Sequence, residues 1–262
     1  MDIESCITPS GRQAVGLVKL QRLRVYCELT RRDPSYTPVI FYTGRSQGYA
    51  ELLAQELGLV DDARDLPCVI ESGTALYYPN SKRTVLVGNA ANLQSNRVLT
   101  HEVSELLRAE LPTYEFEPKC YMITINPAPN QNVEDLLTMV DRILHDSGYE
   151  TNRADTNVPP DPTKRGCFRV TSSASAVDLT PESLPKLNGL LQVAKEAAKK
   201  NIPQNGLGET VAVGDHSNYV EVLRAVGHAY CPTEAHPDVI RVVKQKDATT
   251  SFRRGISSSS YA

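Results

Sequence analysis

Short apolar runs alternate with amphipathic segments in both terminal parts of this chain, and this alternation constrains the fold more than any other feature. Residues 39–42 and 67–70 are apolar runs of strand length. Residues 17–29 and 46–57 instead carry apolar side chains at helical spacing. Ser46 is expected to cap the second helix, with Leu52 and Leu53 on its inner face and Gly58 at its end. Strands alternating with helices are typical of α/β proteins with a parallel sheet, and we predict that class.

The character of the sequence changes between residues 80 and 185. Two helices and three strands are predicted there, at residues 98–111 and 133–145 for the helices, and at 121–125 and twice within 167–179 for the strands. Strands with helices on one side indicate a separate α+β module. Residues 152–165 are polar and hold three prolines, so we expect an exposed, mobile loop.

The α/β pattern resumes after residue 185, with a predicted helix at 187–200, a strand at 210–213 and helices at 220–226 and 236–243. We therefore predict a doubly wound parallel-sheet core from residues 1–79 and 186–243, interrupted by an inserted α+β cap at residues 80–185. Residues 244–262 include four consecutive serines and are predicted to be a disordered tail.

Composition and charge exclude several classes of function. The net charge is −3, and the chain has no basic stripe of the kind that binds nucleic acid. No apolar run is long enough to span a membrane, and the first twelve residues lack the apolar stretch of a signal peptide. The six cysteines are scattered without a C-x-x-C pair, which is typical of reduced thiols. We expect a cytoplasmic protein, either monomer or homodimer, with neither nucleic acid nor membrane as partner.

Three predicted strands end in small or polar residues. Thr43-Gly44-Arg45 follows the first, Glu71-Ser72-Gly73 the second, and Gly214-Asp215 the strand at 210–213. A fourth polar cluster, at residues 1–9, begins Met1-Asp2-Ile3-Glu4. In open parallel sheets, ligands bind beyond the carboxyl ends of the strands. These stretches are therefore candidates for one common site.

Together these motifs resemble those of the haloacid dehalogenase-like (HAD) phosphatases. The similarity is to the branch with a large α/β cap between the second and third motifs, which includes sucrose-phosphate and mannosyl-phosphoglycerate phosphatases. Five stretches match in order and at suitable spacing: residues 2–8, Thr43-Gly44-Arg45, residues 71–74, Asp178-Leu179-Thr180-Pro181 with Lys186, and residues 214–219. The resemblance implies a HAD-like core with an inserted cap.

The resemblance also implies a chemistry, namely Mg²⁺-dependent hydrolysis of a small phosphorylated metabolite through an aspartyl-phosphate. The metabolite would be a sugar phosphate or a phosphoglycerate-like compound. Asp2 would be the nucleophile, and Glu4 would protonate the leaving group and then activate water. Residues implied for the rest of the site are Asp2, Glu4 and Asp215 for Mg²⁺, Thr43, Gly44 and Lys186 for phosphate, and Arg45 and Asn218 for its lining.

Four departures from the family pattern weaken this chemistry. Glu4 and Ser5 stand where the family has Asp and Gly, and Tyr219 stands where it has a second Asp that helps to hold the metal. Only Met1 precedes Asp2, although the family places a central strand there. Either the true start lies upstream of Met1, which we expect, or the chain lacks a central element of the sheet. The alternative to an enzyme is a degenerate, non-catalytic member of the family that binds a phosphorylated ligand or a protein partner.

Overall fold

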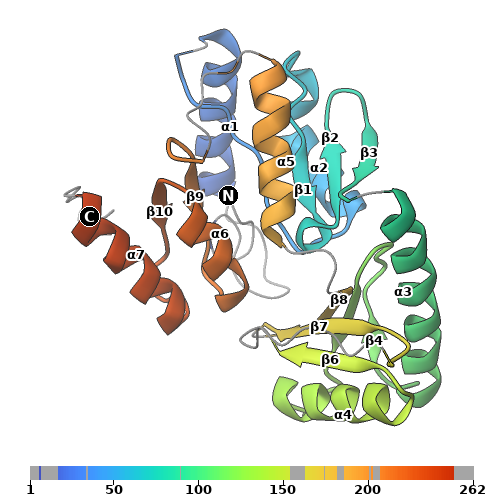
Figure 1. The fold of residues 1–262 in the computed structure, drawn as a ribbon. Helices are drawn as coiled ribbons and strands as arrows, with labels where there is room; N and C mark the ends of the chain where they lie inside the picture. Colours follow the sequence, from blue (N-terminus) through green and yellow to red (C-terminus); the bar gives the residue numbers. More distant parts are fainter. Residues whose placement is uncertain are drawn as a thin grey trace.

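The computed structural model describes residues 6, 17–33, 35–88, 90–153, 163–173, 175–181, 186–200, 202 and 207–250. Both ends of this range build an α/β core, and the middle builds a second part below it in Figure 1. The helices of the core are α1 (Leu17–Arg32), α2 (Gln47–Glu56), α5 (Lys186–Lys199), α6 (Val220–Ala225) and α7 (Pro237–Thr250).

The β-structure of the core consists of two pieces. One is an antiparallel sheet in the order β1-β2-β3, and the other is a parallel pair of β10 and β9. The strands are β1 (Cys68–Ile70), β2 (Ala75–Tyr78), β3 (Arg83–Leu86), β9 (Val211–Val213) and β10 (His228–Tyr230). Among the described residues no strand joins the two pieces.

The strand predicted at residues 39–42 is reduced to a single parallel bridge between Tyr42 and Val69. Two hydrogen bonds hold this segment beside β1: Val69 N–H donates to the Phe41 carbonyl at 2.8 Å, and Thr43 N–H donates to the Val69 carbonyl at 2.9 Å. The segment therefore runs parallel to β1 and ends at the same edge of the sheet.

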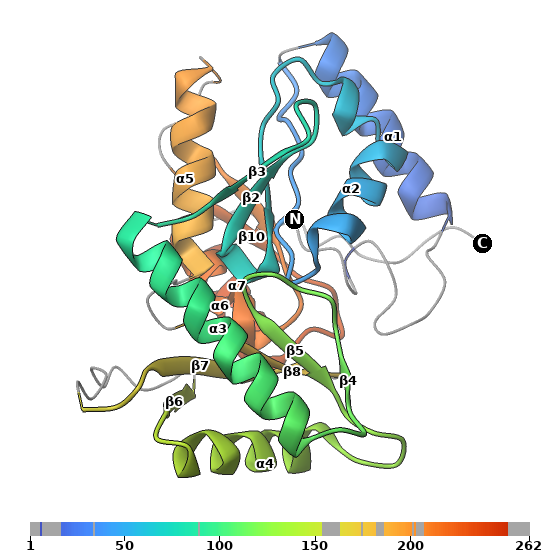
Figure 2. The ribbon, with the colours of Figure 1, turned by 90° about the vertical axis from the view of Figure 1, so that its right-hand side faces the viewer.

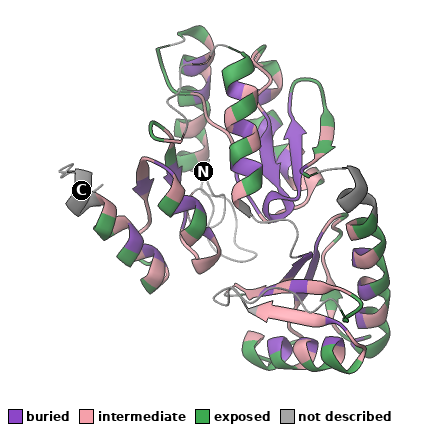
Figure 3. Ribbon diagram, viewed as in Figure 1, coloured by how far each residue is buried: buried purple, intermediate pink, exposed green. Residues whose placement is uncertain are grey.

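Burial explains why β1 and β2 have apolar side chains throughout. Every residue of both strands is buried (Figure 3), because side chains of α2 pack against one set of their side chains and side chains of α5 against the other. α2 ends as predicted at Gly58, whose φ of 69° suits glycine. Ser46 is the N-cap residue, as predicted, although its side chain makes no capping hydrogen bond. The predicted burial of Leu52 is wrong: Leu52 is 64% exposed, because the helix turns only Leu53 of this pair inward.

The middle of the chain forms one five-stranded sheet covered on one face by two helices (Figure 2). The order is β4-β5-β8-β7-β6, with antiparallel pairs except for β6 and β7. The elements are α3 (Ala90–Glu110), β4 (Glu115–Phe116), β5 (Ile123–Asn126), α4 (Val133–Asp146), β6 (Glu150–Arg153), β7 (Cys167–Ser172) and β8 (Val177–Pro181). We call this part the cap.

Period-two alternation gives the cap sheet one apolar and one polar face. Ile123 and Ile125 of β5 pack into a cluster with residues of α3 and α4, whereas Thr124 between them lies among charged side chains. β8 repeats the pattern, with Val177 and Leu179 in the cluster and Asp178 beside Thr124. The helices cover the apolar face, so the polar face is free to meet the core.

Several boundaries differ from the predicted ones. β3 falls within the predicted cap range but pairs with β2, so the chain stays with the core sheet as far as Leu86. β4, β6 and β10 were not predicted, and β6 occupies the start of the expected loop at 152–165. α7 continues to Thr250, so the prediction of disorder is wrong for residues 244–250. Val242 is buried within α7, and Lys246 donates a hydrogen bond to the Val226 carbonyl, which ties this helix to the core.

Two predictions from composition can be compared with the described residues. None of the helices in them is long and apolar enough to cross a membrane. Within the part of the chain that the structure describes, none of the six cysteines forms a disulfide bond.

Candidate active site

The Thr43-Gly44-Arg45 turn leaves the sheet at the end of the segment that runs beside β1. Thr43 is 1% exposed, and its Oγ1 accepts a hydrogen bond from the Arg45 N–H at 3.1 Å. This bond closes the turn and leaves the hydroxyl proton of Thr43 to donate. The segment predicted to bind phosphate is thus a tight turn closed by its own hydrogen bond.

The Glu71-Ser72-Gly73 turn is joined directly to this first turn. Glu71 N–H donates to the Arg45 carbonyl at 3.1 Å, and Ser72 N–H donates to the Thr43 carbonyl at 3.0 Å. A Cβ at Gly44 would lie 3.2 Å from Ser72 Oγ, so a larger residue would press on this contact. Ser72 Oγ is buried and has no hydrogen-bond partner in the structure as described.

The loop after β9 supplies the third element of the site. Gly214 N–H donates to the Tyr230 carbonyl at 3.2 Å, and His236 N–H donates to the Asp215 carbonyl at 2.7 Å. These bonds fix the backbone on both sides of the predicted metal ligand Asp215. Asn218 Oδ1 is buried and finds no hydrogen-bond partner within the described part of the chain.

Tyr219 links the loop after β9 to the segment that carries Thr43. Its side chain is 5% exposed, and its hydroxyl donates to the Tyr42 carbonyl at 3.1 Å. The rings of Tyr219 and Tyr42 meet edge to face, with 5.7 Å between centroids. Because Tyr42 directly precedes Thr43, this contact puts the ends of both segments at one edge of the core. Tyr219 itself belongs to the hydrophobic core.

The start of α5 reaches the same edge. A Cβ at Gly189 would lie 2.8 Å from Val69 Cγ1 and 3.2 Å from Gly73 Cα, so glycine is what allows this close approach. Lys186 is the first residue of α5, but its side chain lies outside the described residues. The predicted phosphate-binding role of Lys186 therefore stays a prediction.

Asp2 and Glu4, the predicted nucleophile and acid–base residue, also lie outside the described residues, as does Ser5. Of the predicted residues that are described, the structure brings Thr43, Gly44, Arg45, Asp215 and Asn218 to one edge of the core. Within the described part no three His, Cys, Asp or Glu side chains gather as a metal site. Asp215 and the Asn218 amide oxygen are oxygen donors of the type that Mg²⁺ prefers, so these residues fit that ion in kind.

The polar face of the cap sheet carries a buried charged network. The Lys119 side chain is 3% exposed; its Nζ lies 3.1 Å from Glu117 Oε2 and 3.9 Å from Asp178 Oδ1. Lys119 also donates to the Thr124 hydroxyl, which donates to Asp178. The network holds Glu117 in place at the edge of the cap.

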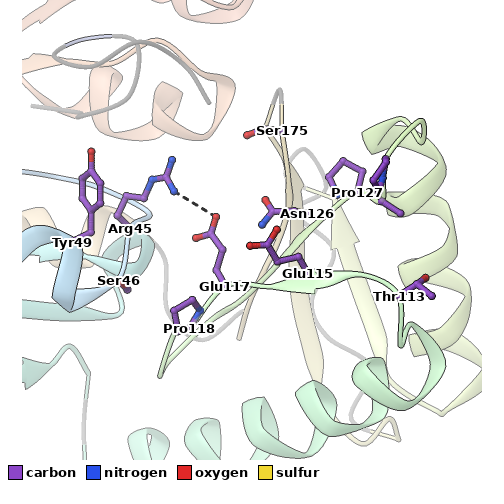
Figure 4. A pocket seen from close by; sticks show the side chains of 12 residues that line it. Arg45, Ser46, Tyr49, Thr113, Glu115, Glu117, Pro118, Asn126, Pro127 and Ser175 are labelled. Atoms are coloured by element: carbon purple, nitrogen blue, oxygen red, sulfur yellow. Dashed lines mark ion pairs between the residues drawn. The ribbon is translucent and has the colours of Figure 1, made fainter. Parts of the chain in front are cut away.

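A pocket of about 710 Å³ lies between this cap edge and the start of α2 (Figure 4). Arg45, Ser46 and Tyr49 line it from the core. The cap contributes mainly polar residues and prolines, among them Glu115, Glu117, Pro118, Asn126 and Ser175. Thr43, Gly44, Asp215 and Asn218 are not part of this lining, but Arg45 belongs to both the turn and the pocket.

Arg45 spans the gap between core and cap. Its Nη1 lies 3.5 Å from Glu117 Oε1, the ion pair drawn in Figure 4, and its guanidinium lies 5.4 Å from the centre of the Tyr49 ring. The cap residues that line the pocket were not predicted from the sequence. Alternation at residues 121–125 marks a strand, but it does not tell which face meets the core.

The fold and the site define a class of protein: an α/β core whose strand-end turns converge at one edge, with an inserted α+β cap over that edge. Solved structures of HAD-like proteins are similar to this chain over most of its length, and the chain has the HAD-like fold. One is a haloacid dehalogenase-like hydrolase from Bacteroides thetaiotaomicron, with a TM-score of 0.60 and 14% identity over 92% of this chain and 90% of that one.

Two further structures show the same fold. A protein from Plasmodium vivax described as HAD/COF-like hydrolase has a TM-score of 0.59 and 12% identity over 93% of this chain and 86% of that one. A structure described for a trigonal-bipyramidal intermediate in a phosphoryl-transfer superfamily has a TM-score of 0.52 and 11% identity over 95% of both chains. No protein-family model and no curated protein sequence matches the chain.

Proposed function

We propose that the protein is a Mg²⁺-dependent phosphatase of a small phosphorylated metabolite. The observation that supports it most is the convergence of Thr43-Gly44-Arg45, the 71–73 turn, the Asp215 loop and the start of α5 at one edge of a HAD-like core. Thr43 and Gly44 would bind the phosphate, together with Lys186. Asp2 would attack phosphorus, and Glu4 would give a proton to the leaving oxygen and later take one from water.

Mg²⁺, held by Asp2 and Asp215 with Glu4 nearby, would neutralise charge on the phosphoryl oxygens. Asn218, whose buried Oδ1 has no hydrogen-bond partner among the described residues, would line the site beside Asp215. Arg45 would border the phosphate on one side and the pocket on the other.

The pocket between core and cap would take the organic part of the substrate. Its charged lining consists of two carboxylates, Glu115 and Glu117, and one guanidinium, Arg45, which pairs with Glu117. A second anionic group on the substrate would meet net negative charge there. Hydroxyl groups would instead find acceptors in the carboxylates and Asn126. This favours a sugar phosphate over a phosphoglycerate-like compound.

The test is hydrolysis of p-nitrophenyl phosphate with and without Mg²⁺ by the wild-type chain, Asp2→Asn and the control Asp33→Asn. Asp33 is an exposed aspartate after α1, so Asp33→Asn should leave the rate of hydrolysis unchanged. We expect Mg²⁺-dependent hydrolysis in the wild type and the control, with background rates in Asp2→Asn. A wild-type rate no higher than that of Asp2→Asn, in a folded protein, would reject the phosphatase.

A second candidate is a non-catalytic protein that binds a phosphorylated ligand. The position of Tyr219 favours it, since a core side chain stands where the resemblance calls for a metal-binding aspartate. This candidate predicts that inorganic phosphate raises the melting temperature although no aryl phosphate is hydrolysed. Absence of both effects would exclude it as well.

A further inference from the structure

Glu71 is a core residue whose carboxylate is bound by the backbone of the cap. Glu71 Oε2 accepts the Tyr121 N–H at 2.7 Å, and both of its oxygens lie 3.1 Å from the Cys120 nitrogen. Glu71 is 1% exposed. A carboxylate removed from water to this extent is costly unless donors replace the lost water, and the cap backbone provides them.

The backbone at Glu71 is shaped for this contact. Glu71 and Ser72 have φ angles of 45° and 58°, in the left-handed region that residues with a Cβ rarely adopt. The Glu71 carbonyl accepts the Thr74 hydroxyl at 2.8 Å and the Thr74 N–H at 3.2 Å, which holds the turn. Such strain persists only where surrounding contacts enforce it, and here it accompanies a side chain directed at the cap.

Two ion pairs also join core and cap among the described residues, and both are partly exposed to solvent. Arg45 and Glu117 lie 3.5 Å apart, with side chains 27% and 20% exposed. Arg169 of β7 and Glu221 of α6 lie 3.8 Å apart and are more exposed. Partly solvated ion pairs contribute little, whereas hydrogen bonds from N–H groups to a buried carboxylate are strong. Glu71 therefore makes the strongest of these links.

We infer that Glu71 is a positioning residue, which fixes cap residues 117–122 against the core and thereby sets one wall of the pocket. Glu117 and Pro118, which line the pocket, lie three and two residues before Cys120, the first residue that Glu71 binds. Cap placement is then set by a carboxylate of the core even without a ligand. The consequence for turnover rests on the proposed phosphatase function, but the placement itself does not.

The primary test is amide hydrogen exchange in Glu71→Gln. This change keeps the shape of the side chain but turns one acceptor into a donor that faces backbone N–H groups. We expect the Cys120 and Tyr121 amides to exchange at least about tenfold faster, equivalent to about 1.4 kcal/mol, with β7 and β8 unchanged. Glu110→Gln, at the exposed end of α3, is the matched control and should leave these amides unchanged. Unaltered exchange at Cys120 and Tyr121 in folded Glu71→Gln overturns the inference.

Glu71→Asp separates positioning from a general loss of stability and serves if the Gln variant does not fold. Aspartate keeps the charge but is one methylene shorter, so exchange at these amides should lie between wild type and Glu71→Gln. A uniform rise of exchange across cap and core in the Asp variant would mean a merely structural role and overturns the inference.

A kinetic comparison addresses the pocket. Glu71→Gln should raise KM severalfold for p-nitrophenyl phosphate, whose ring would enter the pocket, with a smaller effect for acetyl phosphate and kcat largely retained. Equal KM changes for both substrates overturn the assigned effect on the pocket wall. If the wild type hydrolyses neither substrate, the phosphatase proposal fails, and hydrogen exchange still decides whether Glu71 positions the cap.

Discussion

Tyr219→Asp should destabilise the protein strongly, although aspartate is the residue that the HAD-like motif has at this position. The sequence predicts that this substitution, with Glu4→Asp, raises phosphatase activity if the scaffold is intact. In the structure, however, Tyr219 is a core residue that is 5% exposed and donates a hydrogen bond to the Tyr42 carbonyl. The substitution would therefore remove a packed ring and bury a carboxylate in its place.

The magnitude can be divided into two parts by Tyr219→Phe. That variant removes only the hydroxyl and its 3.1 Å hydrogen bond, which contributes about 1 kcal/mol. Removing a buried aromatic ring costs about 3–5 kcal/mol more, before any cost of the buried charge. Tyr219→Asp should thus lose at least about 4 kcal/mol, a large part of the roughly 5–15 kcal/mol by which folded domains are stable.

Urea denaturation followed by circular dichroism measures both variants. With an m-value of about 2 kcal/mol/M, Tyr219→Phe should lower the midpoint by about 0.5 M and Tyr219→Asp by about 2 M. Tyr36→Asp, at an exposed tyrosine after α1, is the control for the chemical change alone and should shift it little. Equal midpoints for Tyr219→Asp and Tyr219→Phe would refute the reasoning that Tyr219 holds the two segments together.

Three further predictions concern other parts of the molecule. Burial raises the pKa of the Cys27 thiol to about 11. Exposed Cys120 should therefore react with an aromatic disulfide at pH 8 at least about tenfold faster than Cys27 does. Cys120→Ser should remove the fastest phase of the reaction. A Cβ at Gly227 would lie 1.6 Å from the Gly208 carbonyl oxygen. Gly227→Ala should therefore lower the free energy of unfolding, measured by urea denaturation, by on the order of 2–3 kcal/mol. An unchanged free energy of unfolding would contradict the close approach. Burial, partly offset by backbone hydrogen bonds, raises the pKa of the Glu71 carboxyl above 4.5. The stability that this group contributes is complete below pH 4.5 and declines as the pH rises through its native pKa. Glu71→Gln should therefore flatten the decline above pH 4.5, and parallel curves of stability against pH for both proteins would contradict this.

Much of the fold could be predicted from the sequence because its elements have strong periodicity. The helices predicted at residues 17–29 and 133–145 lie where the patterns put them, as α1 and α4. The short strands were harder. β4 and β10 have two and three residues, which is too few for an alternating pattern to stand out. β6 is polar, so no apolar pattern marks it as a strand; it is recognised as one only by its pairing with β7.

The candidate site could be predicted only where it follows the chain. Thr43-Gly44-Arg45 and the Asp215 loop each follow an apolar segment, so their place at a sheet edge could be inferred. The cap residues of the pocket could not, because Glu117 and Asn126 reach it through the packing of two parts distant in sequence. The Glu71 contact has the same origin, since its partners lie some fifty residues along the chain.

Tyr219 shows why a motif position cannot be assigned a function from its alignment alone. By motif it is a lost metal ligand, and by structure it is the residue that joins the Asp215 loop to the Tyr42 segment. If Tyr219→Asp loses activity, unfolding explains the loss as well as chemistry does. Asp2→Asn and Glu4→Asp avoid this ambiguity only if their stability is measured too. Catalysis should therefore be established at Asp2 first, and Tyr219 should be changed only together with a measurement of folding.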